Sequence, residues 1–98
     1  MPRKDVKPAQ EELVEGDFSR VADQQLDELE AGPDTARYNA ILDTCDLIFR
    51  LPNHAGMRSS AITTNDGIIA RLAVPGHFPY KVFWSTQGPR IEAIFPHP

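Results

Sequence analysis

The feature that most constrains the fold is a change in hydrophobic period at Pro52. Before this proline, apolar residues recur at helical spacing along one face, namely Tyr38, Ile41, Leu42, Cys45, Ile48 and Phe49. After it, short apolar runs alternate with polar residues and are separated by Gly, Pro and Asn. Helices followed by strands predict an α+β protein, with the helices packed on one face of a sheet.

Two consecutive helices are expected before the change of period. Ser19 is a suitable N-cap for the first helix, whose apolar positions stop at Gly32 and Pro33. Asp34 can cap the second helix, which should end near Leu51 because the residue before a proline disfavours helical geometry. Since few residues separate the two helices, we predict that they form an antiparallel hairpin.

The second half of the sequence predicts a sheet of three or four antiparallel strands. Asn65, Asp66 and Gly67 supply the left-handed backbone that a tight hairpin needs. The expected strands cover residues 59–64, 68–74, 80–86 and 90–95. A further short strand within residues 13–19 has weaker support, because Gly16 lies there between acidic residues.

Length and composition indicate one small domain. The chain has 98 residues, a usual size for a single domain. Residues 1–12 are polar and lack an apolar period, so we expect a flexible tail before a domain of residues 13–98. No apolar stretch is long enough for a membrane span or a secretory signal, and we therefore expect a cytoplasmic location without membrane association.

The residues that usually bind metals are few. The single cysteine, Cys45, lies on the apolar stripe of the second helix, and we interpret it as a packed thiol. His54 and His77 fall in expected loops and lack the spacing of metal ligands. We therefore expect neither a metal site nor another cofactor.

Charge is divided unevenly along the chain. The net charge of −4 disfavours binding to nucleic acid. However, residues 1–49 carry five Lys and Arg against twelve Asp and Glu, a balance of −7. Residues 50–98 carry five against two, a balance of +3, so the half that should form the sheet is basic.

In the expected strands at residues 68–74 and 80–86, the alternation of side chains predicts which residues lie outside the core. Successive side chains of a strand point to opposite faces. The apolar, even-numbered residues should pack beneath the helices; they are Ile68, Ala70, Leu72, Val74, Tyr80, Val82 and Trp84. The face away from the helices, called the outer face below, should then carry Arg71, Lys81, Phe83 and Ser85.

The last strand adds an acidic residue to this surface. Ile91, Ala93 and Phe95 suit the core, which leaves Arg90, Glu92 and Ile94 on the outer face. A basic and aromatic surface results. The plainer interpretation is a solvated sheet face, on which Glu92 pairs with Lys81 or Arg71.

Several short segments carry a resemblance to a known family. They read AILDTCDLIFRLP at 40–52, IARLAVPG at 69–76, PYKVFW at 79–84 and RIEAIFPH at 90–97. Together with ADQQL at 22–26, they resemble the RelE/ParE toxins of bacterial type II toxin-antitoxin systems. The order of the expected elements is similar as well, and the resemblance covers about residues 18–98.

The resemblance implies a RelE/ParE-like fold and one of two activities. One is a ribosome-dependent mRNA endonuclease, and the other is a non-catalytic inhibitor of DNA gyrase. A cognate antitoxin would silence either activity by wrapping over the domain. In the nuclease branch, matching motifs place Arg71 and Lys81 at the basic strand positions and His97 near the C-terminal catalytic position.

Cleavage of this kind needs a base for the RNA 2′-hydroxyl, cations for the phosphate and an acid for the leaving oxygen, and no metal. Arg71 and Lys81 suit the cationic role, and a histidine such as His97 can transfer protons near neutral pH. We also expect substrate contacts from Arg58, Phe83 and Arg90.

Arg71, Lys81 and His97 favour the nuclease. The alternative is a non-catalytic binding module that inhibits gyrase or has lost activity. Glu92 would repel phosphate, and the net charge is acidic. His97 lies between Pro96 and Pro98, where the plainer interpretation is a solvated end residue.

Overall fold

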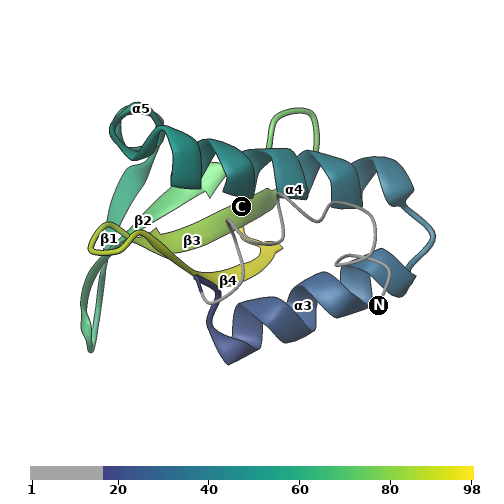
Figure 1. Cartoon of the computed structure of the whole chain (residues 1–98), viewed down its shortest axis with the longest axis horizontal. Helices are drawn as coiled ribbons and strands as arrows, with labels where there is room; N and C mark the ends of the chain where they lie inside the picture. Colours follow the sequence, from purple (N-terminus) through teal and green to yellow (C-terminus); the bar gives the residue numbers. More distant parts are fainter. Residues whose placement is uncertain (1–16) are drawn as a thin grey trace.

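The chain folds with its helices before a four-stranded antiparallel sheet (Figure 1). The computed structural model describes residues 17–98. Its elements are α3 (Arg20–Ala31), α4 (Thr35–Arg50), α5 (Pro52–Arg58), β1 (Ser60–Thr64), β2 (Gly67–Ala73), β3 (Tyr80–Ser85) and β4 (Arg90–Pro96). The strands lie in the order β1-β2-β3-β4. The α+β class is confirmed, whereas the tail predicted for residues 1–12 and the start of the domain at residue 13 lie outside the described residues.

Local capping sets the ends of the two long helices. The Ser19 hydroxyl accepts a hydrogen bond from the backbone N–H of Ala22 at 3.0 Å, and an Asp34 carboxylate oxygen accepts one from the N–H of Arg37 at 2.9 Å. α4 ends at Arg50, as the following proline predicts. α3 and α4 run in opposite directions on either side of a short connection, which confirms the expected helical hairpin (Figure 1).

The short helix α5 is a feature that the sequence analysis missed. Pro52 was interpreted only as the end of a helix, but it also occupies the first turn of α5. Proline suits this position because its fixed φ is helical and the missing N–H would have no intrahelical partner. Ala55 of α5 is fully buried against the core, so the chain turns back over the sheet before β1 begins.

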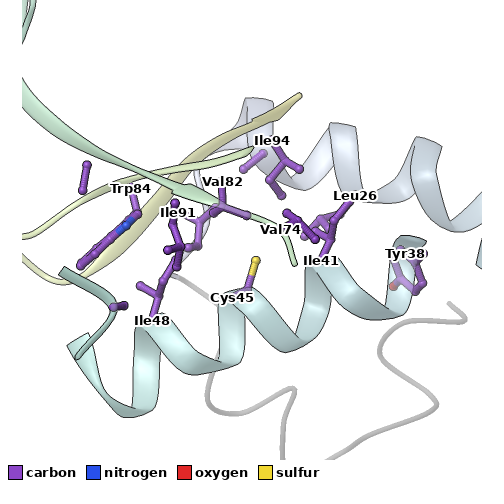
Figure 2. Packing of buried hydrophobic residues seen from close by; sticks show 14 residues of the cluster. Leu26, Tyr38, Ile41, Cys45, Ile48, Val74, Val82, Trp84, Ile91 and Ile94 are labelled. Carbon is purple, nitrogen blue, oxygen red and sulfur yellow. The ribbon is translucent and has the colours of Figure 1, made fainter. Parts of the chain in front are cut away.

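The core lies between the helical hairpin and the sheet (Figure 2). Its largest fully buried side chains are Trp84, Leu26, Ile41, Ile48, Ile91, Ile94, Val82 and Cys45. Burial of each large aliphatic side chain contributes roughly 1.5–3 kcal/mol relative to exposure. The burial of Cys45 confirms its interpretation as a packed thiol.

The β1–β2 hairpin extends past the helices that cover the rest of the sheet (Figure 1). Ile68, near the tip of this hairpin, is therefore 69% exposed, and its predicted position in the core is wrong. Gly67 has a φ of +123°, while neither Asn65 nor Asp66 has a positive φ, so the left-handed backbone is confined to the glycine.

A β-bulge in β4 changes which residues face the core. Trp84 pairs with Ile91 and Phe83 pairs with Ala93, so Glu92 is an extra residue between these pairs. One extra residue reverses the alternation of every side chain that follows it. Ile94 is accordingly 2% exposed and Phe95 is 36% exposed, so the predictions that Ile94 lies on the outer face and Phe95 in the core are wrong.

The segment that precedes α3 runs alongside β4. Phe18 forms an isolated parallel bridge with Ile91, supported by hydrogen bonds from the Ser19 N–H to the Ile91 carbonyl and from the Ile91 N–H to the Asp17 carbonyl. Of the short strand expected within residues 13–19, the described residues show this single bridge and no strand, and residues 13–16 lie outside the described part. None of the helices in residues 17–98 has the length and apolar character needed to cross a bilayer.

Candidate functional site on the outer sheet face

Arg71 and Lys81 emerge on the outer face of the sheet. Arg71 lies opposite Phe83 in the β2–β3 register, and Lys81 lies opposite Ala73. Their neighbours Leu72 and Val82 are buried beneath the helices, so both cationic side chains point the other way. The alternation that predicted this placement holds because β2 and β3 pair without a bulge along this stretch.

The bulge in β4 brings His97 to the same face. Because the alternation reverses after Glu92, Phe95 and His97 follow the outer face instead of the core face. The His97 N–H donates to the Pro79 carbonyl at 2.8 Å, which holds the C-terminal segment beside β3. His97 is half-buried and its backbone is hydrogen-bonded to Pro79, so its interpretation as a solvated end residue is wrong.

Arg71 and His97 are joined by a hydrogen bond between side chains. The distance from Arg71 Nη1 to His97 Nδ1 is 2.9 Å. A guanidinium group can only donate hydrogen bonds, so His97 Nδ1 must be the acceptor. In this arrangement Nδ1 carries no hydrogen, and the hydrogen of the ring is on Nε2.

Lys81 completes the arrangement from the neighbouring strand. Its Nζ donates to the backbone carbonyl of His97 at 2.9 Å and to the carbonyl of Pro79 at 3.2 Å. Arg71, Lys81 and His97 therefore meet although they come from β2, β3 and the C-terminal segment. We call these three residues the basic cluster.

Phe83 supports the basic cluster from below. Its ring stacks on Phe95 with a centroid distance of 4.5 Å, and the His97 ring is nearly perpendicular to it with a centroid distance of 5.4 Å. With these rings over it, Phe83 is only 4% exposed. Phe83 therefore has almost no accessible surface for the expected contact with a substrate, because the bulge places Phe95 and His97 on top of this side chain.

Arg90 lies away from the basic cluster. It pairs with Ser85, at the end of β3 opposite to Lys81. Its guanidinium contacts the Glu92 carboxylate at 3.4 Å, and Glu92 also accepts a hydrogen bond from the Ser85 hydroxyl at 3.0 Å. Glu92 thus faces outward as predicted, but its partner is Arg90 rather than Arg71 or Lys81.

Arg58 is also separate from the basic cluster. It ends α5 and lines a groove between α4 and the end of β2, together with Ala40, Asp43, Thr44, Leu47, Leu72, Ala73 and Pro75. The expectation that Arg58 contacts substrate assumed that it leads directly into β1, whereas it ends the helix α5, which the sequence did not predict.

The basic cluster carries positive charge that its protein partners do not neutralise. Within residues 17–98, ion pairs with carboxylates involve Arg37, Arg50 and Arg90, but neither Arg71 nor Lys81. In the same part of the chain, the hydrogen-bond partners of Arg71 and Lys81 are a hydroxyl, a ring nitrogen of His97 and backbone carbonyls, none of which is a carboxylate. Two half-buried cations that have no carboxylate partner among the described residues favour the binding of an anion.

Sequence reasoning missed two residues of this surface. Ser60 accepts a hydrogen bond from Arg71 Nε at 3.2 Å, and the Phe78 ring lies 5.1 Å from Lys81 Nζ. The contact with Ser60 can be found by counting back from the hairpin turn, because the pairing of Thr64 with Gly67 also pairs Ser60 with Arg71. Phe78 belongs to a loop, where no period indicates the direction of a side chain.

Comparisons with known proteins identify no relative of this chain. Scans of protein families, of curated proteins and of solved structures each found no match. In the part of the chain from residue 17 onward, no three His, Cys, Asp or Glu side chains gather in a way that could hold a metal ion. The geometry of the basic cluster is therefore the basis for assigning a function.

Proposed function

We propose that this protein is a RelE/ParE-like toxin that binds RNA on its outer sheet face and cleaves it in the cytoplasm, in association with the ribosome. The observation that carries the proposal is the convergence of Arg71, Lys81 and His97, with hydrogen bonds of 2.9 Å from each cation to His97. Their unneutralised charge suits the phosphates of RNA. A cognate antitoxin would be the protein partner that covers this face.

The basic cluster can stabilise the charge that develops during cleavage. The 2′-oxygen attacks the adjacent phosphorus, the bond to the 5′-oxygen breaks, and negative charge grows on the phosphoryl oxygens. Arg71 and Lys81 would donate hydrogen bonds to these oxygens. Cleavage of this kind requires proton transfers but no metal.

The hydrogen bond between Arg71 and His97 determines when His97 can accept a proton. While Arg71 donates to Nδ1, that nitrogen is occupied and the other carries hydrogen. A phosphate that binds the Arg71 guanidinium competes for the same donor and releases Nδ1. Substrate binding would thereby prepare His97 for proton transfer.

The test is induction of the protein in bacterial cells, followed by sequencing of cellular RNA ends. We expect new, ribosome-dependent cuts with the natural chain and at least a hundredfold loss of cuts for Lys81→Ala, because a cation at the phosphate is removed. Arg90→Ala is the matched control, since Arg90 lies on the same sheet but pairs with Glu92; it should cut normally. Unchanged cutting by Lys81→Ala would contradict the proposal.

A non-catalytic binding module is the second candidate, and one observation favours it. The bond from Arg71 to His97 Nδ1 leaves no ring nitrogen ready to act as a base. Such a module would inhibit DNA gyrase or bind a partner without chemistry. Inhibition of supercoiling by the purified protein, with cellular RNA intact, would support this candidate, and normal growth after induction would contradict both.

A further inference from the structure

Phe78 is an exposed aromatic residue beside the basic cluster. It lies in the loop between β2 and β3 and is 79% exposed, although large apolar side chains usually avoid water. Lys81 Nζ lies over its ring, 5.1 Å from the centroid. The same ammonium group donates to the carbonyl of His97, so Phe78 is next to the anion-binding groups.

Backbone hydrogen bonds hold the loop that carries Phe78. The carbonyl of Pro79, the next residue, accepts from Lys81 Nζ at 3.2 Å and from the His97 N–H at 2.8 Å. Within the loop, the His77 N–H donates to Val74 and the Tyr80 N–H donates to His77. The exposed ring is thus attached to the basic cluster through its own neighbour in sequence.

We infer that Phe78 stacks on an unpaired base of a single-stranded RNA whose adjacent phosphate is bound by the basic cluster. This inference rests on the proposed function, because it assigns the nucleotide part of the same site. Lys81 covers one face of the ring, and a base can take the other face. A base inside a duplex is already stacked on both sides, so the arrangement selects single strands.

If Phe78 stacks on a base, removal of its ring should lower the affinity for RNA only when the RNA carries bases. Fluorescence anisotropy would compare three probes: a labelled single-stranded RNA, the same sequence in a duplex, and an abasic strand with the same backbone. Phe78→Ala should weaken binding of the single strand about tenfold and leave the abasic strand unchanged, since aromatic stacking contributes about that much per base. Phe78→Trp should keep the affinity, because it keeps an aromatic face, whereas Phe78→Leu should not.

Two further variants separate the failure of this inference from the failure of the proposed function. Met57→Ala is the matched control, because Met57 is an equally exposed apolar residue on α5, away from the basic cluster. Arg71→Ala should weaken binding of all three probes. If Arg71→Ala weakened RNA binding, while Phe78→Ala and Met57→Ala bound the single strand with equal affinity, the stacking inference would be wrong. The proposed function would not be contradicted by that result.

The remaining outcomes are equally decisive. Absence of RNA binding by the natural chain would overturn the proposed function and the stacking together. If Phe78→Ala reduced binding of a protein partner and left RNA binding unchanged, the exposed ring would be a protein-docking residue, and the inference would be wrong. Because Phe78 is exposed, none of these substitutions at residue 78 should unfold the domain.

Discussion

Ser59 and Ser60 are adjacent in the sequence but contact opposite faces of the sheet. The Ser59 hydroxyl accepts a hydrogen bond from Trp84 Nε1 at 3.1 Å and donates to the Ala55 carbonyl at 2.8 Å, both on the side of the core. The Ser60 hydroxyl accepts from Arg71 Nε at 3.2 Å on the outer face. One serine therefore satisfies a buried donor, and the other orients a cation of the basic cluster.

These positions predict different effects of the same substitution. Ser59→Ala should lower the free energy of unfolding by about 1–3 kcal/mol, because it leaves the indole N–H of Trp84 buried without that acceptor. Ser60→Ala is the matched control and should change stability by less than about 0.5 kcal/mol, since Ser60 is exposed. Urea denaturation measures both, and equal losses would contradict the assigned roles.

Among single residues, those whose direction follows from strand alternation could be predicted from the sequence. Arg71 and Lys81 were placed correctly because their neighbours in sequence are apolar and buried. Phe83 was expected to be accessible, and it is not. Its burial depends on Phe95 and His97, which cover it from another strand.

At the scale of elements, the bulge in β4 gives the basic cluster its third member. Without the extra residue at Glu92, strict alternation from the buried Ile91 would direct His97 toward the helices. The bulge instead places Ile94 in the core and Phe95 outside. The position of His97 beside Arg71 is thus a consequence of one irregular pair in the sheet.

Alanine substitutions at residues 94 and 95 test this arrangement of β4. Ile94→Ala should destabilise the fold by about 2–5 kcal/mol, because it removes a fully buried side chain. Phe95→Ala should cost clearly less, since Phe95 is partly exposed on the outer face. Thermal or urea unfolding distinguishes the two cases, and a larger loss for Phe95→Ala would show that β4 alternates without a bulge.

The elements that the sequence predicted well have strong local signals. Ser19 and Asp34 cap the helices where they were expected, and the glycine at residue 67 closes the first hairpin. The missed elements lack such signals. Pro52 is equally compatible with the end of α4 and the start of α5, and nothing in the residues around Glu92 indicates a bulge.

At the scale of the whole molecule, acidic and basic charge are separated. The net charge is −4, and the sheet half carries the positive balance. On that half, Arg90 is paired with Glu92, and Arg58 lies in the groove near α4. Among residues 17–98, the basic cluster is consequently the part of the outer face where no carboxylate pairs with the positive charge, and we expect an RNA strand to bind there despite the acidic total.

The most direct test of this claim follows individual side chains by nuclear magnetic resonance while a short single-stranded RNA is titrated into the protein. We expect the signals of the Arg71 guanidinium and of the His97 ring nitrogens to shift most, because phosphate competes for the Arg71 Nη1 group, which now donates a hydrogen bond to His97 Nδ1. The Nε–H signals of Arg58 and Arg90 should not shift. Saturable shifts at Arg58 or Arg90, with Arg71 and His97 unmoved, would contradict the claim.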